Sequence, residues 1–250
     1  MIQDETSLRG FLGRILGWSA ASAVENALRS VQLSVAHSAT LVLLGDDDLV
    51  SIAHGLHRHA LGVEPPFVVC DRIRADRRES VRAPRSYASG VAAIQAATGG
   101  SVYMLRRRRP RDFSAMAELV KGRAPVQFIL CSDFYEALHP FLLRPVPLQI
   151  PPLSARTSDL PRIVEEYARD ASRELSADEA MFRRAERDWV IAHSASTLLE
   201  IEKGTRRLVA LRQVGSIYGA AKRLGISHVA LAQWLGRRRY GGRRYEGGES

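Results

Sequence analysis

The stretch TLVLLGDDDLVSIAHGLHRHA, residues 40–60, combines a short apolar run, a glycine and a helical pattern. The run 41–44 predicts a buried strand, and residues 49–60 predict a helix that begins just after the loop. A strand, a glycine loop and a helix in this order are typical of a phosphate site, whose loop carries further glycines and a lysine. Here Gly45 is followed by Asp46, Asp47 and Asp48. The sequence therefore predicts the scaffold of a phosphate site without its chemistry.

Three further apolar runs follow: PPFVVC (65–70), GGSVYML (99–105) and APVQFILCSD (124–133). Helical patterns at 49–60, 88–98 and 112–121 lie between the runs, with Asp112 as a candidate N-cap, and a further amphipathic helix is expected at 20–36. Strands that alternate with helices predict an α/β layer with a mainly parallel sheet. The proline-rich segment 145–153 predicts an edge strand or a connector. From residue 159 onward the pattern is helical.

Charge is concentrated at the C-terminus. The formal net charge is +9, and residues 201–250 hold 11 Lys and Arg against 3 Glu. A basic module that follows a nearly neutral body is typical of a nucleic-acid-binding domain attached to a regulatory one. No apolar run reaches the roughly 20 residues that a membrane helix needs. The N-terminus has no secretory pattern. Both cysteines lie in apolar runs, so we expect reduced, buried thiols in a cytoplasmic protein.

The segment GSIYGAAKRLGISHVALAQWLGRR, residues 215–238, predicts two short helices joined by a tight turn at Gly225. Ser227 is the expected N-cap of the second helix, whose apolar face continues through Val229 or Ala230 and then Leu231 and Leu235. Such a helix would enter a DNA major groove, with basic residues near phosphates. The expected DNA-binding residues are Ser227, His228, Val229, Ala230, Gln233, Lys222, Arg223, Arg237, Arg238 and Arg239. The alternative is an ordinary helical hairpin with a solvated charged face.

This segment resembles the Fis-type helix-turn-helix that ends the sigma-54-dependent transcriptional activators, whose pattern has paired alanines followed by LGIS. The matching residues are Gly215, Ala220, Ala221, Leu224, Gly225, Ile226, Ser227, Leu231 and Leu235. Upstream, PPFVVCD, AIQAATGGSVYM, VQFILCSD and DWVIAH are similar to segments of the AAA+ domain of that family, in the same order. The resemblance runs from about residue 8 to residue 238.

The resemblance implies an α/β fold: an AAA+-like parallel-sheet P-loop-type domain with a helical lid, followed by an all-α C-terminal helix-turn-helix module. We expect the AAA+-like α/β subdomain at 1–153, the helical lid at 154–211 and the DNA-binding module at 212–240. The Gly/Arg/Tyr-rich segment 241–250 is an expected disordered tail.

The residues that carry the chemistry of the family are missing. The lysine of the phosphate loop is absent, and the position of the magnesium-binding Asp-Glu pair falls on Leu105 and Arg106. The sensor pair falls on Ser132 and Asp133, the second sensor arginine on Leu199, and the arginine fingers near Tyr135 and Phe141 or Leu142. The sigma-54-binding loop has no counterpart between residues 71 and 94. The resemblance therefore implies a degenerate nucleotide site that does not bind ATP, formed by Gly45, Asp46, Asp47, Asp48, Leu105 and Arg106.

We therefore expect a sequence-specific DNA-binding transcriptional regulator with a catalytically inactive AAA+-like domain, and no enzyme activity, cofactor or metal. The expected partners are double-stranded DNA, a second copy through the C-terminal module, and RNA polymerase or another protein, without membrane binding and within the cytoplasmic nucleoid. His54, His57 and His59 are expected on a solvated helix rather than at a metal.

Two alternatives stay open. One is a protein that modulates active AAA+ relatives. The other is a sensor of a nucleotide or second messenger that binds through arginines rather than through a phosphate loop. The arginines in question are Arg72, Arg74, Arg77, Arg78 and Arg106–Arg109.

Overall fold

A computed structural model describes residues 2–75, 84–132 and 147–240. The chain divides into two compact units, Met1–Pro152 and Leu153–Ser250. This division lies one residue before the boundary expected between the α/β subdomain and the helical lid. The expected disordered tail at 241–250 lies outside the described residues.

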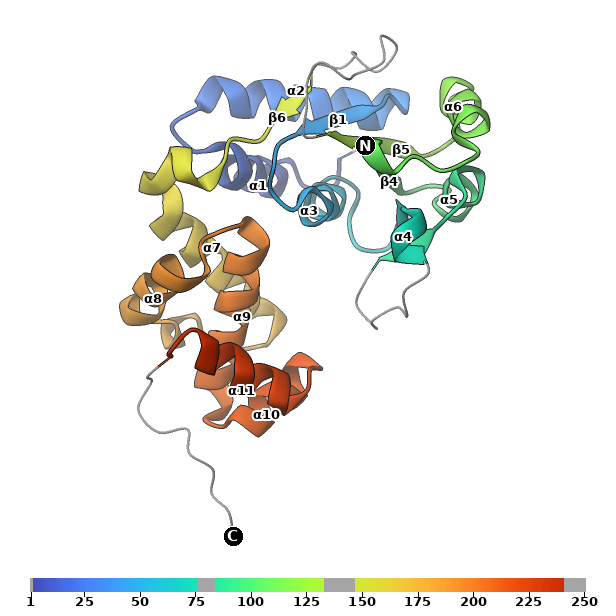
Figure 1. Cartoon of the computed structure of the whole chain (residues 1–250). Helices are drawn as coiled ribbons and strands as arrows, with labels where there is room; N and C mark the ends of the chain where they lie inside the picture. Colours follow the sequence, from blue (N-terminus) through green and yellow to red (C-terminus); the bar gives the residue numbers. More distant parts are fainter. Residues whose placement is uncertain (1, 76–83, 133–146, 241–250) are drawn as a thin grey trace. The chain divides into compact units, whose positions relative to one another are not determined.

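The first unit is built on a parallel sheet of six strands in the order β3-β2-β4-β5-β1-β6 (Figure 1). Every described strand pair is parallel. The strands are β1 (Leu41–Leu44), β2 (Phe67–Cys70), β3 (Arg85–Tyr87), β4 (Ser101–Leu105), β5 (Gln127–Ser132) and β6 (Leu148–Gln149). The prediction of an α/β layer with a mainly parallel sheet is confirmed. The proline-rich segment supplies β6 at one edge.

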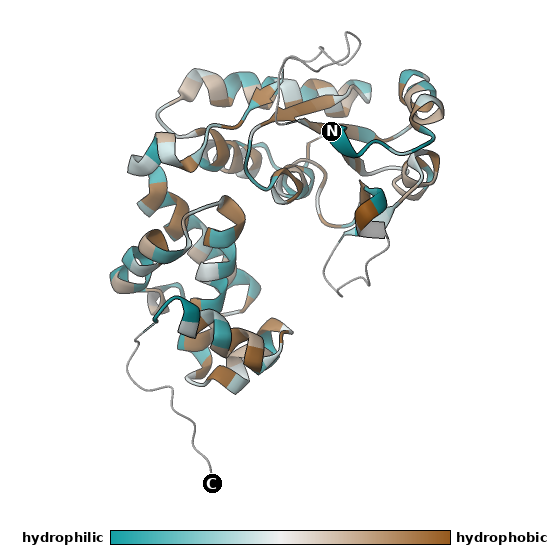
Figure 2. Cartoon of the chain, in the orientation of Figure 1, coloured by the Kyte–Doolittle hydropathy of each residue, from teal (hydrophilic) through white to brown (hydrophobic). Residues whose placement is uncertain are grey.

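Helices cover the sheet, and the central strands β1 and β5 are therefore buried along their whole length and β4 at all but its last residue, as is usual for parallel strands. The helices of this unit are α1 (Glu5–Leu16), α2 (Ala21–His37), α3 (Leu49–Leu61), α4 (Arg72–Ala75), α5 (Gly90–Ala96) and α6 (Phe113–Lys121). Val102, Met104 and Phe128 of the sheet form a hydrophobic core with Ile94 of α5 and Met116 of α6. In Figure 2, β1 has the colour of hydrophobic residues, whereas the helices carry both colours.

Asp112 corrects one local prediction. It precedes α6 as expected, but its carboxylate makes no capping hydrogen bond to that helix. Instead it accepts hydrogen bonds from the Ser89 hydroxyl (2.7 Å) and from the backbone N–H groups of Gly90 (2.8 Å) and Val91 (3.0 Å), at the start of α5. Burial raises the pKa of this carboxyl group, but these hydrogen bonds outweigh burial and lower the pKa to about 2. Asp112 therefore joins the start of α5 to the start of α6.

The expectation that the three histidines of α3 lie on a solvated face is wrong for His57, which is only 1% exposed. One ring nitrogen of His57 lies 2.8 Å from the Ser101 hydroxyl and the other 2.9 Å from the Pro65 carbonyl oxygen. The Ser101 hydroxyl also lies 3.0 Å from the side-chain oxygen of Gln127. Burial lowers the pKa of His57. His57 thus joins α3 to β4 and β5 through buried hydrogen bonds.

The second unit consists of helices. They are α7 (Leu160–Glu174), α8 (Arg184–Ser194), α9 (Leu198–Val214), α10 (Ile217–Leu224) and α11 (His228–Arg237), with short 3-10 segments at Leu153–Asp159 and Glu179–Met181. Helix α9 packs against α7, α8 and α10. It continues across residues 211 and 212, where the lid and the C-terminal module were expected to separate. Among the described residues of both units, no helix has the length and apolar composition that crossing a membrane requires.

Candidate functional site

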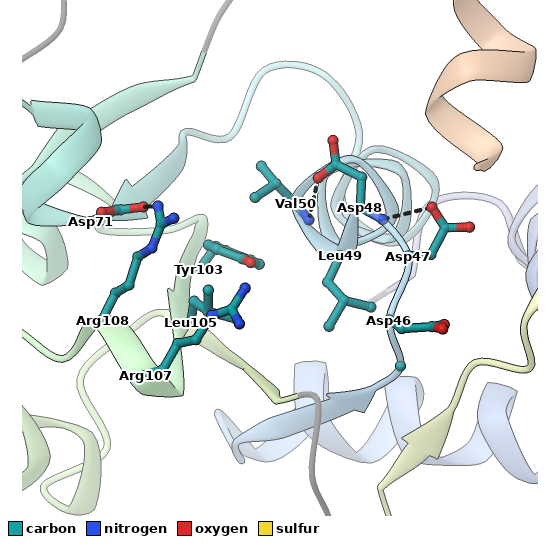
Figure 3. Close-up of a pocket in the computed structure, with 11 residues that line it drawn as sticks. Asp46, Asp47, Asp48, Leu49, Val50, Asp71, Tyr103, Leu105, Arg107 and Arg108 are labelled. Atoms are coloured by element: carbon teal, nitrogen blue, oxygen red, sulfur yellow. Dashed lines mark hydrogen bonds and ion pairs between the residues drawn. The ribbon is translucent and has the colours of Figure 1, made fainter. Parts of the chain in front are cut away.

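A pocket of about 390 Å³ lies where β1, β2 and β4 end (Figure 3). Ligands of open α/β sheets bind in this place, outside the carboxyl ends of the strands. The lining residues are Gly45, Asp46, Asp47, Asp48, Leu49, Val50, Asp71, Tyr103, Leu105, Arg107 and Arg108. Five of the six residues predicted for the degenerate nucleotide site are therefore brought together. Arg106 is not among the lining residues.

One wall of the pocket is the acidic loop between β1 and α3. The Asp48 carboxylate caps α3, since it accepts hydrogen bonds from the Val50 N–H (3.2 Å) and the Ser51 hydroxyl (3.4 Å). The Asp47 carboxylate accepts one from the N–H of Asp48 (2.6 Å). The N-terminus of a helix is where backbone N–H groups and the helix dipole favour a bound phosphate. Here a carboxylate of the protein itself occupies that position.

The opposite wall is basic. Arg107 and Arg108 belong to a 3-10 turn, η1 (Arg106–Arg108), that begins where β4 ends. Arg108 donates a hydrogen bond of 2.7 Å to Asp71, whose side chain is only 4% exposed and which directly follows β2. Asp71 also accepts a hydrogen bond from the N–H of Ile73 (2.9 Å). The ion pair therefore fixes η1 to the end of β2.

The charges of the pocket disfavour a nucleoside triphosphate. The lining of the pocket contains four carboxylates and two guanidinium groups, which give it a formal charge of −2. The side chain of Leu105 has no oxygen to offer a magnesium ion. Of the other positions named from the resemblance, Leu199 lies in α9 of the second unit. Ser132 ends β5, but Asp133, Tyr135, Phe141 and Leu142 lie outside the described residues, as do Arg77 and Arg78, and the side chain of Arg74 is not described.

A second candidate site is the pair of helices α10 and α11, which pack against each other. Gly225 has φ +67°, a conformation that favours glycine, and the N–H of Ile226 bonds to the Ala221 carbonyl (3.0 Å). The Ser227 hydroxyl accepts a hydrogen bond from the N–H of Ala230 (3.3 Å), so its predicted role as N-cap of α11 is confirmed. The turn joins the helices with three residues.

The packing of α11 differs from the prediction at its first turn. Val229 is 50% exposed and Ala230 is exposed too, so neither continues the apolar face. The buried side chains of α11 are Leu231, Trp234 and Leu235. Most of the residues predicted to bind DNA are exposed. They are Ser227, His228, Val229, Ala230, Gln233, Lys222, Arg223, Arg237 and Arg239.

Two of the predicted phosphate-binding arginines have partners within the protein. Arg238 donates to Glu200 (2.7 Å) and to the carbonyl oxygen of His193 (3.2 Å), and its guanidinium lies 5.0 Å from the ring centre of Trp234. Arg223 donates to the carbonyl oxygen of Leu175 at the end of α7. Both side chains therefore hold α10 and α11 to the rest of the helical unit. From a run of arginines in the sequence alone, it is not visible which of them binds a partner within the protein.

Comparison with known proteins gives likenesses in structure alone. No family model matches the chain, and no curated protein matches it. Among solved structures, the chain is similar to NtrX from Brucella abortus, with 13% sequence identity over 86% of this chain and 68% of that chain and a TM-score of 0.45. A likeness of this size carries no conclusion about function.

Proposed function

We propose that the protein is a sequence-specific DNA-binding regulator of transcription in which α10 and α11 form a helix-turn-helix. The observation that carries this proposal is the exposed face of α11, in a segment whose charged side chains are all basic. Residues 215–240 contain five Lys and Arg and no Asp or Glu. In the described part of the chain, no carboxylate pairs with Lys222, Arg237 or Arg239. Cationic side chains that are not paired with a carboxylate can displace the counterions of DNA phosphates. The release of these counterions supplies most of the affinity for any sequence.

We further propose that the α/β unit is AAA+-like and does not hydrolyse ATP. Asp48 already occupies the N-terminus of α3, where the phosphate would bind. Leu105 stands where the resemblance expects a magnesium-binding carboxylate. The negative charge of the pocket adds repulsion toward a triphosphate. The protein would accordingly regulate without ATP-driven remodelling, as a homodimer that binds two half-sites and contacts RNA polymerase or another protein.

The alternative of a nucleotide or second-messenger sensor has less support. It needs arginines that are free to bind phosphate, and Arg108 is already paired with Asp71. Arg107 lines a pocket whose other charged residues include four aspartates, Asp46, Asp47, Asp48 and Asp71. A thermal-shift panel of nucleotides separates the two functions, because a bound ligand raises the melting temperature by mass action. We expect no shift with ATP or with cyclic dinucleotides. A shift of several degrees at millimolar nucleotide would favour the sensor.

The decisive test of the main proposal is selection of binding sites from a random DNA library by the purified full chain, followed by measurement of affinity against salt. We expect an enriched sequence, and an affinity that falls as salt rises. Arg237→Ala should weaken binding about equally on all sequences and lower the salt slope by about 1. Arg111→Ala, an exposed arginine of the first unit, is the matched control. Recovery of no enriched sequence would refute the proposed function.

A further inference from the structure

We infer that α11 recognises A·T base pairs, with Gln233 hydrogen-bonded to an adenine and Val229 against the methyl group of a thymine. This inference rests on the proposed DNA-binding function and adds the bases to it. It comes from the composition of the outer face of α11, which contains one side chain able to form two directional hydrogen bonds to a base, surrounded by small or apolar residues.

The outer face follows from helix geometry. Leu231, Trp234 and Leu235 are buried and define the inner side of α11. At about 100° per residue, the positions opposite them are 229, 233 and 236. These are Val229, Gln233 and Gly236, and all three are exposed. These three residues form the outermost row of α11, and this row would lie deepest in a major groove.

Gln233 is the hydrogen-bonding group of this row. In the major groove a glutamine amide pairs with adenine, because its oxygen accepts from the N6 amine while its nitrogen donates to N7. Guanine presents two acceptors and is matched by arginine or lysine, and cytosine presents a donor and is matched by a carboxylate. No carboxylate lies between residues 215 and 240, and Arg237 is one turn closer to the C-terminal end of α11. The chemistry of the row therefore matches adenine.

The remaining residues of the face let the helix approach closely and give it apolar contacts. Ala230, Ala232 and Gly236 are exposed and carry little or no side chain. Val229 is 50% exposed, so its methyl groups are available to a partner. The C5-methyl of thymine is the apolar group that the major groove offers. Lys222, Arg237 and Arg239 pair with no carboxylate among the described residues, so this face is complementary to a groove bordered by phosphates rather than to an apolar protein surface.

Two neighbouring polar residues are placed less well for this role. The Ser227 hydroxyl oxygen already accepts the capping hydrogen bond from Ala230. His228 faces α10, since the centre of its ring lies 6.1 Å from that of Tyr218. Gln233 is therefore the side chain from which we expect base discrimination.

The test uses the full chain and the site enriched by selection. Gln233→Ala should remove the preference at one A·T pair and leave the other positions unchanged, with a loss of between about 5-fold and about 150-fold on the selected site. Replacing that adenine by 7-deazaadenine, which lacks the N7 acceptor, should weaken the native protein but not Gln233→Ala. Replacing a neighbouring thymine by uracil should weaken the native protein and have no effect on Val229→Gly.

A specificity change makes the test independent of a general loss of binding. Gln233→Arg should exchange the preferred adenine for guanine, since arginine pairs with O6 and N7 of guanine. Gln95→Arg, an exposed glutamine of α5, adds the same charge outside α11 and should leave the preferred base unchanged. The inference is overturned if the position that depends on Gln233 is a guanine or a cytosine. It is also overturned if Gln233→Arg does not change the preferred base. In both cases the proposed function stands. If selection enriches nothing, the proposed function fails together with it.

Discussion

Replacing Asp112 by alanine should destabilise the α/β unit in a way that depends on pH. The Asp112 carboxylate accepts three hydrogen bonds, from the Ser89 hydroxyl and the N–H groups of Gly90 and Val91. The pKa lowered from 3.8 to about 2 corresponds to about 2 kcal/mol, and solvent around this part-buried group reduces the expected loss to about 1–2 kcal/mol at neutral pH. Loss of a helix N-cap has a similar cost.

The pH dependence has a definite direction. The unfolded chain takes up a proton on this carboxylate near pH 3.8, whereas the folded chain keeps it charged down to about pH 2. The contribution of Asp112 is therefore complete above about pH 5 and decreases as the pH falls toward 2. Urea denaturation of the native protein and Asp112→Ala should show a difference in unfolding free energy that shrinks between pH 5 and pH 3.

The matched control is Asp4→Ala, which removes an exposed N-cap with one backbone hydrogen bond, from the N–H of Ser7 (2.9 Å). We expect it to cost less than Asp112→Ala. If Asp112→Ala loses no more stability than Asp4→Ala, or if its deficit is the same at pH 5 and pH 3, the three hydrogen bonds do not hold the carboxylate as described.

Three further predictions concern single side chains. Arg238→Ala should lower the stability of the helical unit by about 1–2 kcal/mol, because it removes an ion pair and a cation–π contact. The control Arg237→Ala should change stability by less than about 0.5 kcal/mol. Urea denaturation of both variants checks this prediction. Asp71→Asn should cost about 1–3 kcal/mol, and its effect should not add to that of Arg108→Ala if the two side chains act as a pair, which a double-mutant cycle measures. The pKa of His57 is lowered in the folded state, so this residue contributes stability above its unfolded pKa of about 6.5, and that stability is lost as the pH falls. His57→Gln should therefore reduce the loss of unfolding free energy between pH 7 and pH 5. A pH profile identical to that of the native protein would contradict the burial of this ring.

The parallel sheet was predictable because buried parallel strands are continuous apolar runs. The runs at 41–44, 67–70, 101–105 and 127–132 all became strands. β3 was missed because Arg85, Ser86 and Tyr87 are polar or only partly buried, and three residues at the edge of a sheet show no alternation. The N-terminal helix α1 was not predicted either, and its sequence includes Gly10 and Gly13, which weaken a helical pattern.

The errors at the candidate sites arise where side chains meet across long sequence separations. Nothing local to Asp112 shows that its carboxylate caps a helix that begins 22 residues earlier. In the run Arg106–Arg109, identical residues give no clue to which of them the turn after β4 directs into the pocket. His57 was the exception. It belongs to the apolar stripe of α3, beside Ile52, Ala53, Leu56 and Ala60, and this spacing indicates a buried position.

If the protein binds DNA as a homodimer, as proposed, the continuity of helix α9 limits how two copies share one operator. The helix is continuous from Leu198 to Val214, and only Gly215 and Ser216 separate it from α10, while Arg238 and Arg223 hold the following helices to α8, α9 and the end of α7. Because no flexible linker joins α10 and α11 to the rest of the helical unit, they cannot move independently of it to reach a displaced half-site. The DNA helical phase should therefore set the spacing of the operator. Inserting about 5 base pairs between half-sites should abolish paired binding, and about 10 should restore contact with the same side of the duplex.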